Sequence, residues 1–145
     1  MADAKKAKLT PGEIVIVAAG AVAVVFSFFP WFRVVGGFYF GAWATGLFPL
    51  ATLVPILGGL MMVQVLVDKL AGATKSRGIG DFTWDQLHLV MAVGAAVVAF
   101  CYLIRAREPD TSFGFGFYVD LAATVALVVG AVMIRNERRS ATPPA

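Results

Sequence analysis

The fold is decided by the uncharged run from Gln86 to Ile104, which reads QLHLVMAVGAAVVAFCYLI. The hydrocarbon core of a bilayer is about 30 Å thick, and about 20 helical residues cross it. The run is therefore long enough for one transmembrane helix. Two further runs without a formal charge extend from Ile14 to Phe32 and from Val34 to Val67. The second of these is too long for one straight span, so its first part is expected to be a connection.

A fourth apolar run, from Leu121 to Ile134, continues toward the N-terminus as far as Phe115 past a single acid, Asp120. Together the four runs predict transmembrane helices over about residues 12–31, 45–67, 84–104 and 115–134. We therefore expect an all-α polytopic membrane protein, a four-helix bundle over residues 1–139 that forms one domain. Residues 140–145 are expected to be a disordered tail.

Short motifs mark helix starts and bends. Thr10 and Glu13 have the spacing of a capping box, in which each side chain bonds the backbone amide of the other. Thr83 and Gln86 have the same spacing before the third run. Two prolines, Pro49 and Pro55, lie within the second predicted helix and are expected to kink it.

The composition agrees with a lipid environment. The 145 residues are 59% hydrophobic and 14% charged, and their mean hydropathy is +0.82. A soluble domain of this size could not bury that much apolar surface. The single cysteine, Cys101, excludes an internal disulfide and does not favour a cysteine-based metal site. The sequence shows no catalytic constellation, and no cofactor or metal is expected.

The basic residues predict the orientation. Nine lysines and arginines lie near one side of the predicted bundle, and three, Arg33, Arg105 and Arg107, lie near the other. Because cytoplasmic loops carry the excess of positive charge, both termini are expected in the cytoplasm. The net charge of +3 is then mostly a topology signal, and nucleic-acid binding is not expected.

One acid is expected inside the membrane. Asp120 lies about five residues inside the outer edge of the fourth helix, and an acid at such a position is usually paired or functional. Arg105, at the outer end of the third helix, is the expected partner, and Tyr102 is the alternative donor. The two remaining interpretations are an aspartate that reaches the interface and a group that couples protons or ions.

A second polar cluster is expected at the inner ends of the helices. His88 lies three residues after Asp85, which places both on one helical face. Gln64 lies at a comparable depth on the second helix and could bond to His88. One histidine and one aspartate cannot form a standard metal site. A hydrogen-bonded interfacial histidine is the simpler interpretation, and a pH-sensitive contact is the alternative.

The aromatic residues are distributed unevenly. Of the 3 Trp, 3 Tyr and 12 Phe residues, only Phe82 and Trp84 map to the cytoplasmic side. The outer residues predict an aromatic surface that includes Trp31, Tyr39, Trp43, Phe115 and Tyr118. This surface is interpreted either as a cap anchored in the outer interface or as a contact surface or lipid-binding groove.

Small residues indicate where helices pack closely. In the fourth helix, Ala122, Ala126 and Gly130 repeat at four-residue spacing. Such repeats let transmembrane backbones approach each other. They are interpreted as packing within the bundle, with self-association or a partner helix as the alternative.

Three features, Phe29-Pro30-Trp31, Ala42-Trp43 and the Gly- and Ala-rich run from Leu121 to Ile134, accompany the basic N-terminus. With these, the chain resembles the small four-span integral membrane proteins of actinobacteria, which mostly lack an assigned activity. The resemblance implies a location in a membrane and carries over no catalytic residue.

The functional hypothesis is a non-enzymatic protein of the bacterial cytoplasmic membrane that acts as a scaffold, accessory subunit or self-associating component. Its expected partners are the lipid bilayer and either a membrane-protein partner or further copies in a homo-oligomer. One alternative is a small transporter or pore that uses Asp120. The other is a holin-like lysis protein.

Overall fold

The computed structural model describes residues 8–34, 36–46, 48–70, 82–105 and 111–140. The described chain is mostly helical. Its four helices are α1 (Pro11–Phe26), α2 (Leu53–Leu70), α3 (Trp84–Arg105) and α4 (Phe115–Ser140). Three of them, α2, α3 and α4, are long and apolar enough to cross a membrane, whereas α1 has only 16 residues.

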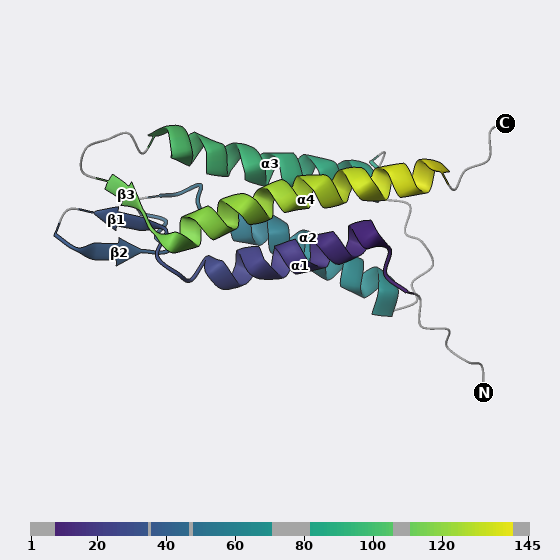
Figure 1. Ribbon diagram of the computed structural model, residues 1–145, viewed down its shortest axis with the longest axis horizontal. Helices are drawn as coiled ribbons and strands as arrows, with labels where there is room; N and C mark the ends of the chain where they lie inside the picture. The colour runs from purple at the N-terminus through teal and green to yellow at the C-terminus, as the bar shows by residue number, and fades with distance from the viewer. Residues whose placement is uncertain (1–7, 35, 47, 71–81, 106–110, 141–145) are drawn as a thin grey trace.

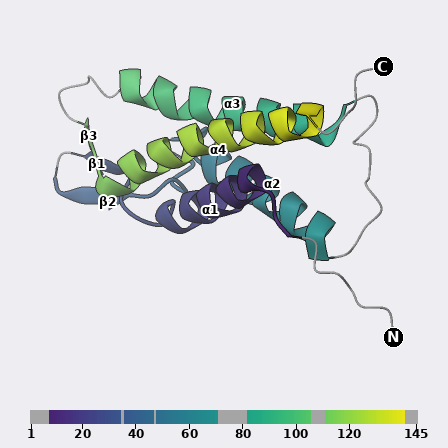
Figure 2. The same cartoon turned by 45° about the vertical axis from the view of Figure 1, so that its right-hand side comes forward.

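The helices run alternately up and down along the long axis of the molecule (Figures 1 and 2). Helix α1 packs against α4 and α2, and α3 packs against α4 and α2, so the four form a ring. The most extensive of these contacts joins α1 to α4, the first and last helices in the chain. We call the end where α1 and α3 begin and α2 and α4 end the polar end, and the opposite end the sheet end.

Helix α1 begins as its capping motif predicts and ends earlier than expected. The Thr10 hydroxyl accepts from the Glu13 amide, and the Glu13 carboxylate accepts from the Thr10 amide at 2.7 Å. The helix ends at Phe26 with Ser27 as its C-cap, so the predicted end at residue 31 is wrong. Pro30 disfavours helix in the residue before it, and the Trp31 amide bonds to the Phe40 carbonyl instead.

The other helix bounds agree in part. Helix α3 matches the predicted 84–104 to within one residue, and the Thr83–Gln86 capping box is present. Helix α2 begins eight residues later than predicted, at Leu53. Pro49 therefore precedes it, and Pro55 lies in its first turn, where a missing amide hydrogen costs little. The expectation of two kinks was wrong. Helix α4 continues beyond the predicted residue 134 to Ser140, and residues 141–145 lie outside the described chain.

The chain is not entirely α-helical, because its sheet end carries three short strands. They are β1 (Phe32–Val34), β2 (Phe38–Phe40) and β3 (Thr111–Phe113), paired antiparallel in the order β2-β1-β3. The turn between β1 and β2 contains Gly36 and Gly37, both with positive φ, which other residues rarely adopt. Phe32 lies opposite both Phe40 and Phe113. The sheet therefore joins the first connection of the chain to the last.

Two buried clusters fill the bundle. The first, toward the polar end, is formed by small and aliphatic residues of all four helices: Ile16, Ala19, Met61, Val65, Ala92, Leu127, Ala131 and Ile134. The second, beneath the sheet, is aromatic and includes Trp31, Phe32, Tyr102 and Phe117. In this second cluster the Phe113 and Phe117 rings stack with centroids 3.9 Å apart. The aromatic cluster fixes the sheet on the ends of the helices.

Candidate functional site

A buried hydrogen bond joins the sheet end to α4. The indole nitrogen Nε1 of Trp31 donates to Oδ2 of Asp120 at 2.7 Å, and both side chains are fully buried. Trp31 directly precedes β1, and its backbone bonds to both flanks: its amide donates to Phe40, and its carbonyl accepts from Gly114. The tryptophan is thereby held in place by backbone contacts independent of the carboxyl group. The second oxygen of Asp120, Oδ1, has no partner among the described residues.

The expected pairing of Asp120 with Arg105 is not present. Arg105 is exposed at the end of α3, whereas Asp120 faces the interior, so the two side chains lie in different environments. Tyr102, the alternative donor, is also engaged elsewhere, because its hydroxyl accepts from the Leu50 amide at 3.3 Å. The sequence argument correctly expected a partner for the acid and assigned the wrong one.

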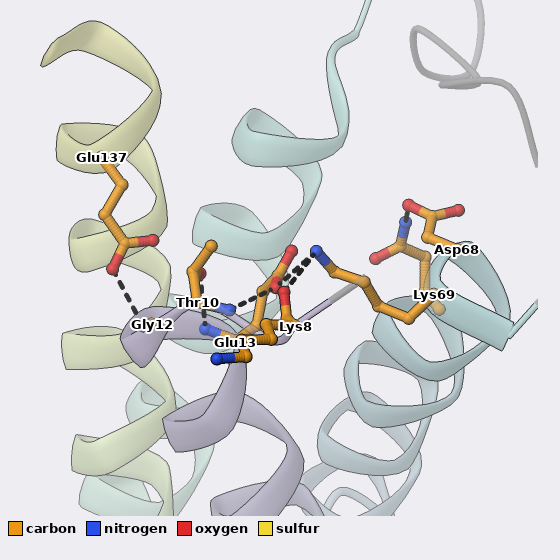
Figure 3. Close-up of polar contacts among 8 residues, drawn as sticks. Lys8, Thr10, Gly12, Glu13, Asp68, Lys69 and Glu137 are labelled. Atoms are coloured by element: carbon orange, nitrogen blue, oxygen red, sulfur yellow. Dashed lines mark hydrogen bonds and ion pairs between the residues drawn. The ribbon is translucent and has the colours of Figure 1, made fainter. Parts of the chain in front are cut away.

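Charged and polar groups tie the helices together at the polar end (Figure 3). Lys69 of α2 forms an ion pair with Glu13 of α1, with 2.9 Å between Nζ and Oε2. Glu137 of α4 accepts from the Gly12 amide at 3.0 Å, which places a carboxylate at the positive end of the α1 dipole. Each of these contacts crosses between helices, so α1 is held at this end by both of its neighbours.

The residues predicted as an inner cluster lie at this end without forming one hydrogen-bonded unit. Asp85 pairs with Arg138 of α4, with 2.8 Å between Oδ1 and Nη1. Gln64 donates to Asp68 on its own helix rather than to His88. His88 is buried, and among the described residues neither of its ring nitrogens has a hydrogen-bond partner. The predicted Gln64–His88 bond is therefore wrong.

Most of the predicted aromatic surface is exposed. Tyr39, Trp43, Phe115 and Tyr118 all lie on the molecular surface near the sheet end. Trp31 is the exception, because it is fully buried. Trp43 also has an inward contact, since its Nε1 donates to the Ser27 hydroxyl at 2.9 Å. Trp31 is thus a core residue that positions the acid, and the other four are surface residues.

The closest helix approaches involve Gly20 of α1, which the sequence argument did not select, and Gly130 of α4, which it did. A Cβ at Gly20 would lie 2.5 Å from the Gly58 carbonyl oxygen of α2. A Cβ at Gly130 would lie 2.8 Å from Cγ1 of Ile16 in α1. Of the predicted stripe in α4, Gly130 is buried against α1, Ala126 is half-buried and Ala122 is exposed. The four-residue repeat turns gradually around the surface of the helix, so only Gly130 lies at the contact between α4 and α1.

Two shallow grooves mark the outward face of α3 near the sheet end. The larger, about 460 Å³, lies between α3 and α4, and its floor includes Ala96 and Val128. The smaller, about 220 Å³, is lined by Tyr102, Arg105 and Leu50 together with aliphatic residues of α3. Val97 and Cys101 border both grooves. The larger groove is lined only by apolar side chains and Cys101.

No protein family, curated protein or solved structure matches this chain. In the described chain, no group of three or more His, Cys, Asp and Glu side chains could hold a metal ion. The buried polar groups His88 and Asp120 lie toward opposite ends of the bundle, with the first apolar cluster between them.

The functional residues that sequence reasoning missed are Trp31 as a buried donor and Glu137 as the cap of α1. Trp31 is 89 positions from Asp120, and Glu137 is 125 positions from Gly12. A signal existed for Glu137, since an acid at the end of a helix is unfavourable unless it has a partner elsewhere. No local sequence pattern indicates that Trp31 is a buried donor, because its sequence context is that of an ordinary interfacial tryptophan.

Proposed function

We propose that this chain is a non-enzymatic integral membrane protein of a bacterial cytoplasmic membrane that acts as a scaffold or accessory subunit. It spans the bilayer four times, and the polar end lies in the cytoplasm. The shortest span consists of α1 and the non-helical residues 27–31 that follow it. Its work is done by contacts that its outer faces make with a partner membrane protein or with further copies of itself.

The observation that supports this proposal is the distribution of apolar side chains. Large aliphatic residues are exposed on every helix, among them Val25, Ile56, Val63, Val97 and Val129. The buried polar groups include Ser27, His88, Asp120 and Thr124. In water such a surface would associate without specificity, whereas lipid solvates it. The faces of the helices are therefore the surfaces available for selective contact within the membrane.

The interior gives little support to the transporter or pore alternative. A proton or ion that crossed the bundle would need polar groups along its whole path. Between Asp120 and His88 the interior is closed by buried apolar residues that pack together, including Ile16, Met61 and Leu127. Asp120 itself is engaged by Trp31. The packed centre thus favours a structural role over conduction.

Charge distribution supports the orientation. The described basic residues of the polar end are Lys8, Lys69, Arg135, Arg138 and Arg139, and those of the sheet end are Arg33 and Arg105. The excess at the polar end fits a cytoplasmic location. Reporter tags fused separately to the two termini test this, and both are expected to report the cytoplasm. Reports from opposite compartments would exclude four spans.

Crosslinking in native membranes tests the scaffold role. A Cys101→Ala chain carries one new cysteine at a time, at Val25, Val63 or Val129, and the unmodified chain supplies Cys101 on α3. Each position is exposed on a different helix. We expect a bifunctional maleimide to give one product of defined mass from one or two of these faces. The same positions after dispersal in excess detergent serve as the control.

The masses distinguish the two kinds of partner. A product of twice 15.4 kDa identifies a second copy, and any other defined mass identifies a different protein. If no face yields a defined product in native membranes, the scaffold proposal fails.

A further inference from the structure

We propose that the outward face of α3 binds one diacyl phospholipid with a negatively charged headgroup, its two acyl chains in the two grooves and its phosphate on Arg105. The site requires that α3 and α4 lie in a membrane but does not require the scaffold role. The two proposals can therefore fail separately.

The first step of the argument is the geometry of one helix face. Val97, Cys101 and Arg105 follow each other at four-residue spacing, so they form one ridge along α3. The larger groove is lined by Ala96, Phe100 and Ile104, each of which lies one residue before a ridge position. The smaller groove is lined by Val98 and Tyr102, each of which lies one residue after a ridge position. The ridge therefore separates two grooves that run side by side.

The second step is the charge at the end of the ridge. Arg105 is the last residue of α3, it is exposed, and it lines the smaller groove. Among the described residues no acid forms an ion pair with it. It lies at the same end of the bundle as the exposed rings of Phe115 and Tyr118, which fit the membrane interface. Phosphate groups lie at that level, and arginine binds them with charge-assisted hydrogen bonds.

The third step is the choice of occupant. A helix is about 10 Å wide with its side chains, so one helix cannot enter two grooves separated by a single ridge. A second copy in a symmetric contact at Cys101 would bring its own Arg105 to the same depth, and the like charges would repel each other. A phospholipid supplies two flexible apolar chains and one phosphate in the required arrangement.

Native mass spectrometry of the detergent-purified full chain tests the site. Four probes are titrated separately: diacyl phosphatidylglycerol, its single-chain lyso form, diacyl phosphatidylcholine and glycerol phosphate. We expect one phosphatidylglycerol per chain to bind at lower concentration than the lyso form or phosphatidylcholine. Glycerol phosphate, which lacks chains, is expected to give no retained adduct.

Two substitutions identify the residues responsible. Arg105→Gln is expected to weaken phosphatidylglycerol binding about tenfold or more, because it removes charge-assisted bonds from an exposed position that does not support the fold. Arg33→Gln is the matched control, since Arg33 is an exposed arginine of the same end that lies over the Tyr39 ring. It is expected to leave binding unchanged. Ala96→Phe fills the floor of the larger groove and is expected to weaken binding without altering charge.

Four outcomes would overturn the proposal. The first is equal loss from Arg105→Gln and Arg33→Gln, and the second is equal binding of the diacyl and lyso forms. The third is retention of glycerol phosphate, which would indicate a simple anion site. The fourth is efficient oxidation of Cys101 to a disulfide-linked dimer in phosphatidylglycerol nanodiscs, which would make this face an interface between copies.

Discussion

The indole of Trp31 and the carboxyl group of Asp120 form a 2.7 Å hydrogen bond inside the bundle, between the first connection of the chain and its last helix. A buried polar group without a partner costs free energy, and in a membrane interior water is not readily available to supply one. The bond therefore does two things. It makes the acid compatible with a buried position, and it fixes the register of the sheet against α4.

Trp31→Phe is expected to destabilise the protein by about 2 kcal/mol through loss of this bond, and the smaller ring adds a cavity term. The matched control is Trp43→Phe, which removes a neutral indole–hydroxyl bond from a half-exposed residue. It is expected to cost about 1 kcal/mol or less. Reversible unfolding in mixed micelles measures both values.

A double variant separates the contribution of the hydrogen bond to stability from that of the cavity. Replacing Asp120 with leucine in the Trp31→Phe chain removes the unpaired carboxyl group, so the double variant is expected to be more stable than Trp31→Phe alone. Additive losses would show that the two side chains do not act as a pair.

The glycine contact between α1 and α2 is expected to tolerate no side chain. Gly20→Ala would place a methyl group against the Gly58 backbone, which cannot move aside, at a cost of about 1–3 kcal/mol. Gly94→Ala is the control, because its nearest neighbour, Cδ1 of Leu57, would be 3.7 Å away. That substitution is expected to be neutral or to stabilise α3 by up to about 1 kcal/mol. Thermal midpoints that fall equally for both variants would contradict the close α1–α2 approach.

Glu137 is expected to stabilise α1 although it belongs to α4. Glu137→Ala removes the acceptor of the Gly12 amide and a negative charge at the start of the α1 dipole, for a loss of about 1 kcal/mol. Glu137→Gln keeps an acceptor oxygen and should lose less. Asn136→Ala, at the exposed neighbouring position, is the control, and equal midpoints for Glu137→Ala and Asn136→Ala would refute the cap.

His88→Leu is expected to leave stability unchanged or to raise it by about 1–2 kcal/mol. The imidazole is buried without a hydrogen bond from the described residues, so its removal relieves the cost of burying polar nitrogens. Asp85→Asn, which weakens the ion pair with Arg138, provides the contrast and is expected to destabilise by up to about 1 kcal/mol. A large loss of stability in His88→Leu would assign the histidine a bonding role.

Features that depend on short stretches were predictable. The bounds of α3 and the start of α4 follow from long apolar runs, and the capping boxes of Thr10 and Thr83 follow from spacing alone. The strands were not predictable, because each has three residues and β3 lies in a different connection from its partner β1. The hydropathy pattern also placed the end of the first span at residue 31, because an apolar residue has the same hydropathy whether it lies in a helix or beneath a sheet.

The candidate site residues likewise divide into properties that follow from the residue itself and properties that depend on the fold. The expectation that Asp120 needs a partner is a property of the acid, whereas the identity of that partner depends on the fold. Trp31 was assigned to the surface because tryptophan is common at membrane interfaces. Its burial follows from the antiparallel pairing of β1 with β2 and β3, which no local pattern encodes.

Because α1 packs extensively on α4, the bundle cannot assemble fully until the last helix has been synthesised. Helix α4 begins about 100 residues after α1, and at the usual rates of 5–20 residues per second the delay is about 5–20 seconds. During that time the part of α1 around Gly12 lacks the α4 residues against which it packs in the finished molecule. The contact between α1 and α4 forms only when synthesis is almost complete. Closure of the bundle is therefore a late event, and ribosome-stalled truncations lacking α4 should be readily degraded.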